Sequence, residues 1–210
     1  MLLACAMLVT MGACATRQAG NANDPGRPAS IATASENPRD DLIIATKAQM
    51  DAKSFRSRMV MSMSDGRTSS RLGEFVAPNR FHMVTDHDEA IVVGDATYRR
   101  EPGKPWQRLP IDVGQMIEDF RNSTAIDELR KADVKFVGTE VLDGVSTLVY
   151  QFTTSNIMGI NVTAECKTWV GVNDHLPRKI EVETEFNSTK MKGTNTYYDY
   201  NTDIKIEPPL

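Results

Sequence analysis

Residues 179–187, KIEVETEFN, decide the fold class of this chain. Apolar or β-branched side chains alternate there with acidic ones: Ile180, Val182, Thr184 and Phe186 against Glu181, Glu183 and Glu185. Successive side chains of a β-strand point to opposite faces of its sheet, so this strand has one dry face and one wet face. The segment therefore predicts an antiparallel sheet that packs its dry face on a core.

The same period of two extends outward in both directions. Toward the C-terminus we predict strands over 134–142, 145–154, 164–172, 177–187 and 190–200, with Asp143-Gly144, Asn173-Asp174 and Lys192-Gly193 as turn signals. Toward the N-terminus we predict strands from Phe55 to Met63 and at about 70–77, 80–85, 90–93, 97–101 and 106–109. In the first of these, Phe55, Met59, Met61 and Met63 share one face, opposite Arg56, Arg58 and Ser62.

Helical patterns interrupt the strands at a few places. Asp40 and Asp41 are expected to cap a helix that runs to about Lys53. A second helix should open at Asp112, because Val113, Met116, Ile117 and Phe120 follow the i, i+3, i+4, i+7 spacing. A short helical turn follows near Thr124 and Asp127. About ten antiparallel strands with two or three short helices predict an α+β fold, in which the helices cover the dry face of one curved sheet.

The first thirteen residues, MLLACAMLVTMGA, predict a secretory signal peptide that ends at Cys14. Gly12 and Ala13 before this cysteine resemble a bacterial lipobox, which makes Cys14 the expected site of lipidation, with palmitate among the acyl groups. Neither Lys nor Arg precedes Cys14, which suggests that the natural start lies upstream. The alternative is a buried N-terminal helix with an incidental cysteine.

Residues 14–39 contain mostly Ala, Asn, Ser, Gly and Pro and cannot form a core, so we expect a flexible tether there. A single domain should occupy residues 40–210. Thr16 stands where an Asp is associated with inner-membrane retention, which favours the outer membrane, facing the periplasm, if the organism has two membranes.

The charge and the cysteines limit the possible partners. A net charge of −4, without a cluster of Lys and Arg, gives no footprint for nucleic acid or for an anionic surface, so the membrane link is the lipid anchor. After cleavage Cys166 has no disulfide partner, and its place in a strand predicts a packed, inert thiol. We expect the protein to be a monomer.

Enzyme chemistry is not expected. His82, Asp86, His87, Asp88 and Glu89 could suggest a metal site, but the spacing of the histidines fits neither one strand face nor one helix face. Asp86 to Glu89 are better interpreted as a charged hairpin turn, and we predict no metal and no cofactor. The sequence contains neither a nucleophile-elbow serine motif nor a glycine-rich phosphate loop.

Several motifs, in order and spacing, resemble the LolA/LolB-like lipoprotein-carrier superfamily, including its lipid-anchored LppX/LprG-like branch. They are Pro78-Asn79-Arg80-Phe81, Gly94, Thr97-Tyr98, Trp106, Gly144, Leu148-Val149-Tyr150, Trp169-Val170, Leu176-Pro177-Arg178, Tyr198-Asp199-Tyr200-Asn201 and Ile206-Glu207-Pro208-Pro209. The resemblance implies a half-open β-barrel whose apolar interior, lidded by helices, holds acyl chains. The arginine that closes the lid of the soluble carrier has no clear counterpart here.

The functional hypothesis is a membrane-anchored lipoprotein that binds a lipid or acyl chain as carrier, acceptor or sensor in the cell envelope, with other envelope proteins as candidate partners. The expected cavity-lining residues are Phe55, Met59, Met61, Met63, Met83, Val113, Met116, Ile117, Phe120, Ile180, Val182 and Phe186. Flexible thioethers suit a surface that repacks around variable chains, although methionines also fill irregular cores. The alternative is therefore an accessory lipoprotein with a closed core and no ligand.

Overall fold

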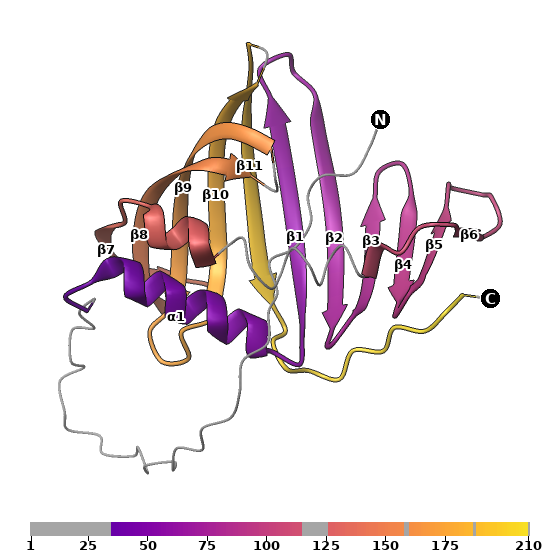
Figure 1. The fold of residues 1–210 in the computed structure, drawn as a ribbon, viewed down its shortest axis with the longest axis horizontal. Coiled ribbons are helices and arrows are strands. Elements are labelled where there is room, and N and C mark those ends of the chain that lie inside the picture. Colours follow the sequence, from indigo (N-terminus) through magenta and orange to yellow (C-terminus); the bar gives the residue numbers. More distant parts are fainter. Residues whose placement is uncertain (1–34, 115–125, 158–159, 187, 210) are drawn as a thin grey trace.

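The computed structural model describes residues 35–114, 126–157, 160–186 and 188–209. Within them, eleven antiparallel strands form one continuous, curved sheet that does not close on itself (Figure 1). The strands are β1 Ser54–Met63, β2 Thr68–Val76, β3 Arg80–Thr85, β4 Glu89–Val93, β5 Ala96–Arg100, β6 Gln107–Leu109, β7 Lys135–Leu142, β8 Val145–Ile157, β9 Ile160–Gly171, β10 Pro177–Phe186 and β11 Thr189–Tyr198. The predicted half-open α+β fold is confirmed.

The chain builds the sheet as two meanders that meet in the middle. The strand order is β6-β5-β4-β3-β2-β1-β11-β10-β9-β8-β7, so the first strand pairs with the last. Met59 lies opposite Asn195 of β11 and opposite Arg71 of β2. This register places Phe55, Met59, Met61 and Met63 on one face of β1, as predicted, and the same face continues through Ile180 and Val182 of β10. We call it the concave face, because α1 packs against it.

Helix α1, Pro38–Asp51, covers one half of the concave face. Its side chains Leu42 and Ala45 belong to a buried cluster with Leu148 and Tyr150 of β8 and Val170 of β9. A short helical segment over 126–131 lies over the same half (Figure 1). None of the helices in the described residues is long and apolar enough to cross a membrane.

The start of α1 differs from the sequence prediction. The N-cap is Asn37, whose side-chain oxygen accepts a hydrogen bond from the Arg39 N–H at 3.2 Å. Pro38 occupies the first turn, where its missing N–H costs nothing. Asp40 and Asp41 stand inside the first turn, where their negative charge complements the helix dipole, so the prediction that they cap the helix was wrong.

The turn expected at Lys192-Gly193 was also wrong. Both residues lie inside β11, with Gly193 opposite Met61. A Cβ on Gly193 would lie 3.6 Å from the Met59 Cε, which is an ordinary van der Waals contact, so a side chain could also be accommodated at this strand position. The turn between β10 and β11 falls before Thr189, where Ser188 has a positive φ of 63°.

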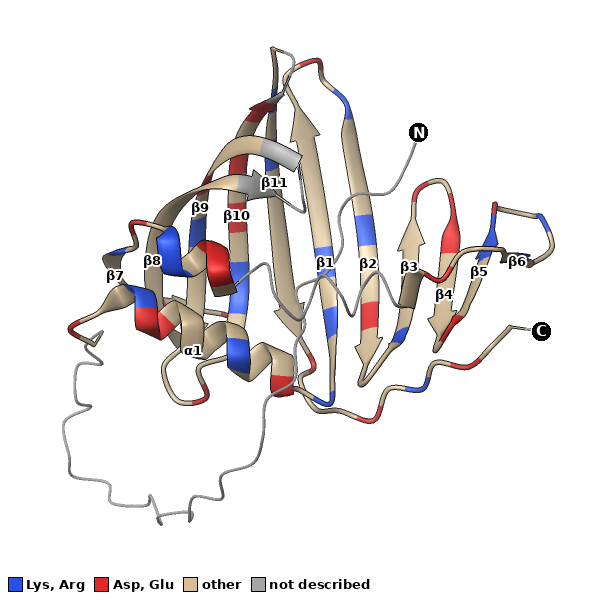
Figure 2. Ribbon diagram, viewed as in Figure 1, with Lys and Arg blue, Asp and Glu red and all other residues tan. Residues whose placement is uncertain are grey.

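A row of charged side chains crosses the opposite, convex face from β1 to β5. Arg56 Nε donates to Glu74 Oε1 at 2.7 Å, and His82 contacts Glu74 Oε2 at 3.0 Å and Glu89 Oε1 at 2.9 Å. Glu89 in turn pairs with Arg100 at 2.5 Å. Acidic and basic residues are interspersed on the strands in the same manner elsewhere (Figure 2). We call Arg56, Glu74, His82, Glu89 and Arg100 the convex ion-pair row.

Candidate pocket on the concave face

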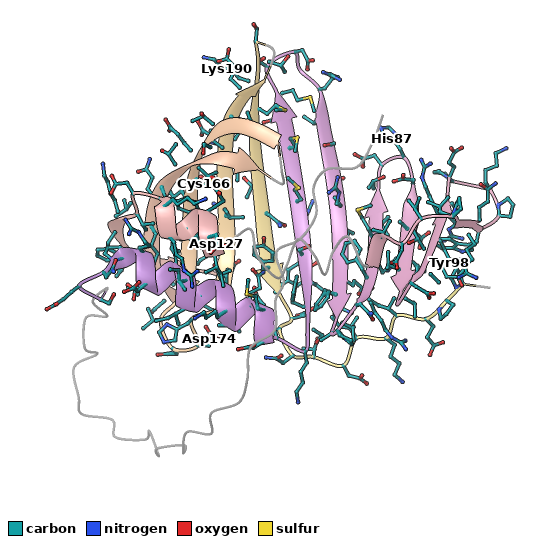
Figure 3. All side chains as sticks on the ribbon, in the orientation of Figure 1. His87, Tyr98, Asp127, Cys166, Asp174 and Lys190 are labelled. Atoms are coloured by element: carbon teal, nitrogen blue, oxygen red, sulfur yellow. The ribbon has the colours of Figure 1, made fainter. Side chains whose placement is uncertain are left out.

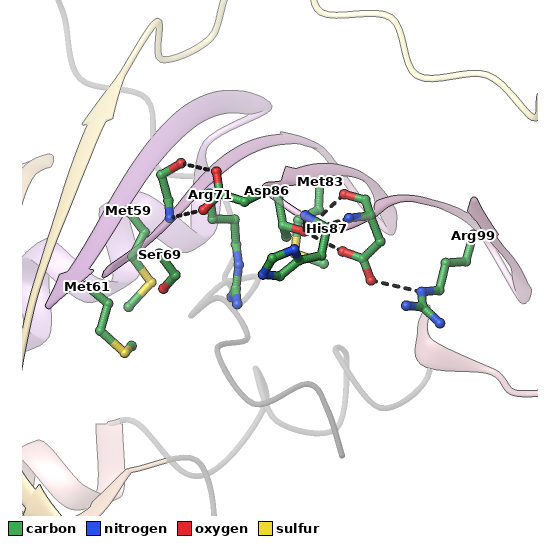
Figure 4. A pocket seen from close by; sticks show the side chains of 11 residues that line it. Met59, Met61, Ser69, Arg71, Met83, Asp86, His87 and Arg99 are labelled. Atoms are coloured by element: carbon green, nitrogen blue, oxygen red, sulfur yellow. Dashed lines mark hydrogen bonds and ion pairs between the residues drawn. The ribbon is translucent and has the colours of Figure 1, made fainter. Parts of the chain in front are cut away.

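A pocket of about 270 Å³ lies on the concave face of β1 to β5, beside the half that α1 covers (Figure 4). Its lining combines thioethers with hydroxyl and charged groups: Met59, Met61, Ser69, Ser70, Arg71, Met83, Thr85, Asp86, His87, Asp88 and Arg99. This volume is close to the lower end of small-molecule pockets, about 300 Å³.

Three methionines form the apolar part of the pocket. Met59 and Met61 are two residues apart on β1, so their side chains point to the same face of the sheet, and both are half-buried. Met83 comes from β3 and is buried, with 7% of its surface exposed. Thioether side chains have three rotatable bonds and a polarisable sulfur, so this surface can adapt to apolar ligands of different shape.

A buried carboxylate and two arginines form the polar part. Asp88 is 8% exposed and accepts hydrogen bonds from Arg99 Nε at 2.8 Å and from the Thr85 hydroxyl at 2.5 Å. Burial raises the pKa of the Asp88 carboxyl, but the bonds from Thr85 and Arg99 and the nearby charges of Arg99 and Arg71 outweigh it. The pKa therefore lies below its ordinary value, and Asp88 is ionised at neutral pH.

The turn between β3 and β4 arranges the rim of the pocket. Asp86 accepts hydrogen bonds from the Ser70 backbone N–H at 2.9 Å and from the Ser70 hydroxyl at 2.8 Å, and these bonds lower its pKa. Its carboxylate is thereby held toward β2. The side chains of Arg71 and His87 instead point side by side into the pocket (Figure 4).

The predicted lining residues have different positions. Met59, Met61 and Met83 line the pocket. Phe55 is fully buried against the rings of Phe75, Tyr197 and Tyr200 at centroid distances of 5.2, 6.0 and 5.6 Å. Met63, Ile180 and Val182 share the concave face without lining this pocket.

The remaining predicted residues are at the border of the described chain. Val113 is half-buried and its backbone N–H donates to the Thr97 hydroxyl at 3.3 Å. Met116, Ile117 and Phe120, as well as Cys14, lie outside the described residues, and so does the side chain of Phe186. The predicted set of twelve cavity-lining residues, taken as a whole, stays a prediction.

Arg71, Arg99 and Asp88 line the pocket without having been predicted from the sequence. A usable pattern was present, because Arg71 stands two and four residues before Gly73 and Phe75, which are buried. A charged side chain that is an even number of residues from the buried positions of a strand points to the same face of the sheet as they do. Asp88 was assigned only to a solvated turn.

The two histidines that suggested a metal lie on opposite faces of the sheet. His82 belongs to the convex ion-pair row, whereas His87 lines the concave pocket. The described residues contain no group of three potential ligands that could hold a metal ion. Cys166 of β9 is buried (Figure 3), and burial raises the pKa of its thiol to about 12.

Comparison with known proteins shows a likeness of fold rather than of sequence. No family model matches the sequence, and no curated protein matches it either. The lipoprotein LppX of Mycobacterium tuberculosis has a TM-score of 0.59 at 16% sequence identity, covering 80% of this chain and 97% of LppX. LprF of Mycobacterium bovis has a TM-score of 0.56 at 10% identity, covering 82% of this chain and 96% of LprF. The chain therefore has the fold of LppX and LprF, and the predicted likeness to LppX is confirmed at the level of the fold.

Proposed function

We propose that this protein is a lipid-anchored envelope protein that binds an acyl chain in its concave pocket, as carrier, acceptor or sensor of a lipid or lipoprotein. The observation that carries the proposal is the cavity of about 270 Å³ beside the packed core, with Met59, Met61 and Met83 in its lining. A binding protein of this kind needs no catalytic group, and we do not propose an enzyme.

The position of the pocket supports a binding role. The half of the concave face beneath α1 is filled by the chain's own side chains, such as Leu148 and Tyr150. The neighbouring half contains adaptable thioethers around an open space. A pocket of this kind, with a few polar groups beside an apolar surface, is the usual form of a small-molecule site.

The anchor is a separate part of the proposal. Cys14 would carry the lipid, and the residues up to Asn37, where α1 is capped, would serve as the tether. A flexible tether of this length spans about 25–30 Å. LppX, which shares the fold, is described as a lipoprotein. The expected location is thus the envelope, and the outer membrane if the organism has two membranes.

The pocket is tested by blocking it. Met61→Trp should abolish binding of a fluorescent fatty acid while the melting temperature changes little, because an open pocket accommodates the indole. The matched control is Val60→Trp, because Val60 is 42% exposed on the convex face of the same strand. This variant should bind like the parent protein.

Two outcomes would contradict the proposal. If the pocket is a filled core, Met61→Trp overpacks it and costs about 1–3 kcal/mol of stability. If the parent protein binds no acyl probe, the accessory lipoprotein without a ligand becomes the better description.

The anchor is tested by Cys14→Ser in the full chain. Acyl labelling and membrane association should both be lost, while the domain keeps its fold by circular dichroism. Persistent labelling of this variant would exclude Cys14 as the lipidated residue.

A further inference from the structure

Strand β7 forms one end of the sheet, and its most exposed large side chains are apolar. Among the described strands it is the last in the order and pairs only with β8. Phe136, Val137 and Val141 are 38%, 53% and 72% exposed, and we call these three side chains the β7 edge. Natural edge strands usually present charged residues to water. Glu140, the acidic residue of β7, instead accepts a hydrogen bond from the Trp169 indole N–H at 2.7 Å.

A β-bulge in β7 leaves one residue of the β7 edge without a strand partner. Phe136 lies opposite Tyr150, and Gly138 lies opposite Val149, the neighbouring residue of β8, so Val137 is the extra residue between them. Gly138 has a φ of 148°, a conformation that favours glycine. A bulge of this kind bends its strand and redirects side chains. The exposure of Val137 is therefore a consequence of the backbone conformation.

The chain enters the domain beside the β7 edge. Helix α1 begins next to β7 (Figure 1). Arg39, in the first turn of α1, donates from Nε to the Ala132 carbonyl at 3.0 Å, just before β7 begins. Asp41 accepts the hydrogen bond of the Tyr150 hydroxyl, and the Tyr150 ring lies 5.8 Å from the ring of Phe136. The segment that precedes α1 thus joins the domain at this end of the sheet.

The charged side chains of residues 127–135, which lead into β7, balance one another. They form three ion pairs: Lys135–Asp133 at 3.9 Å, Lys131–Glu128 at 3.2 Å and Arg130–Asp127 at 2.8 Å. Each pair is neutral as a whole, so the approach to the β7 edge has no excess charge of either sign. Exposed apolar side chains beside balanced charges fit the surface of a bilayer with zwitterionic headgroups.

We infer that the β7 edge docks the domain on the surface of the bilayer that holds the lipid anchor. The inference rests on the anchor of the proposed function and adds a second contact with the membrane. A tether of residues 14–34 spans about 25 Å, so this contact forms within one anchored molecule. Linkage of this kind gives an effective concentration on the order of millimolar. Three apolar side chains can then hold the domain on the surface, although a chain without the lipid would dissociate.

Docking through the β7 edge has a consequence for the concave pocket. The pocket lies on β1 to β5, and Figure 1 shows β7 and β2 to β5 on opposite sides of the molecule. The half of the sheet with the pocket is therefore held away from the bilayer. Labels on the two halves should report different depths.

The test measures the depth of single labels on the lipidated full chain in phosphatidylcholine vesicles. An environment-sensitive fluorophore is attached at Val141→Cys or, as the matched control, at Leu72→Cys, because Leu72 is 48% exposed on the convex face of β2. Cys166 does not compete for the label, since it is buried and its thiol pKa is raised to about 12. Brominated acyl chains should quench the label at position 141 roughly twofold, because interfacial side chains reach about 5–10 Å into the headgroup and acyl boundary. The label at position 72 should not be quenched.

A second variant tests whether the apolar contact causes the quenching. Val137→Asp in the Val141→Cys chain should remove the quenching, because transfer of a carboxylate from water into the boundary is costly. The control is Val60→Asp in the same chain, because Val60 is 42% exposed on the convex face of β1 and should leave the quenching unchanged. Circular dichroism checks that both variants are folded. Addition of phosphatidylglycerol to the vesicles should also change nothing, since the neighbouring charges are balanced.

The outcomes separate the inference from the proposed anchor. Equal quenching at positions 141 and 72, or quenching that persists in Val137→Asp, would overturn the docking inference and leave the anchor intact. Quenching that requires phosphatidylglycerol would also overturn it, because charge would then be the attraction. A chain that carries no lipid and does not sediment with the vesicles would overturn the anchor, and the docking inference with it.

Discussion

The two halves of the concave face have the same strand pattern and different contents. Under α1, Leu42 and Ala45 of the helix pack on Leu148, Tyr150 and Val170 of the sheet and leave a filled core. On β1 to β3, Met59, Met61 and Met83 surround a pocket. An alternating strand thus determines which side chains face inward, and the element that packs on them determines whether they become core or binding surface.

Both halves contain buried apolar side chains, Tyr150 under α1 and Phe55 and Phe75 on β1 and β2. They differ in how their charged side chains are connected. The half with the pocket carries the convex ion-pair row across β1 to β5. Hydrophobic burial depends little on pH or salt, whereas half-exposed ion pairs depend on both.

The largest expected difference is between truncations in the two halves. Leu148→Ala opens a cavity in the filled core and should lower the free energy of unfolding by about 2–5 kcal/mol. Met61→Ala removes side-chain atoms that already border open space, so its cost should stay below about 1 kcal/mol. Denaturant unfolding of both variants measures the difference. Equal costs would show that the pocket is as well packed as the core.

The next effect concerns the bond that joins α1 to the sheet. The Tyr150 hydroxyl donates to Asp41 Oδ2 at 2.7 Å. Tyr150→Phe should cost about 1.5–3 kcal/mol, because a hydrogen bond to a charged group is lost. Chemical unfolding at neutral pH gives this value. A cost near zero would mean that this hydrogen bond adds nothing to the other contacts that hold the helix.

The same variant has an alkaline signature. Burial, followed by the bond to Asp41, raises the pKa of Tyr150 well above its ordinary value of about 10. The stabilising contribution is therefore full below pH 10 and declines as the pH rises above it, since the unfolded chain loses the proton first. Tyr150→Phe should show a shallower decline than the parent protein over that range.

A smaller effect is expected at the start of α1. Asn37→Ala removes the cap on the Arg39 N–H and should cost about 1 kcal/mol. A chain that begins at Asp40 should lose a similar amount relative to one that begins at Ser35. Thermal melts of the two truncated proteins test this. Identical melts would show that packing, and not the cap, fixes the end of the helix.

The smallest effect is expected on acidification of the convex ion-pair row. Burial opposes ionisation of Glu74 and Glu89, but hydrogen bonds from His82 and from Arg56 or Arg100 lower the pKa of both carboxyls. Their contribution is thus present above the ordinary pKa of about 4.5 and is lost as the pH falls through the lower folded value. Each half-exposed pair contributes about 1 kcal/mol or less.

Amide hydrogen exchange can locate this loss. As the pH is lowered past about 4.5, the amide protection in β2 to β4 should decrease before the protection in β8 and β9 decreases. Glu74→Gln should reduce the pH dependence in β2 and β3. A uniform loss of protection over the whole sheet would show that the contribution of the convex ion-pair row is not local to β2 to β4.

Much of the fold followed from the sequence by itself. The alternation in 179–187 and in 55–63 predicted the strands and their inward faces. With a period of two, only one face of each strand carries the apolar side chains, and that face must point to the core. The family resemblance was carried by motifs distributed along the chain, and the structure shows a likeness of fold to LppX and LprF. The local turn signal failed at Lys192-Gly193, because both residues are paired with β1 inside β11.

Only the tertiary structure decided which inward side chains form a site. Phe55 and Met61 share one strand face, yet Phe55 is packed against three aromatic rings and Met61 lines a pocket. Asp88 and Arg99 are eleven residues apart in the sequence and form an ion pair because β4 and β5 fold back on each other. A strand pattern specifies direction along one chain, whereas filling and pairing depend on the neighbours that the fold brings to each position.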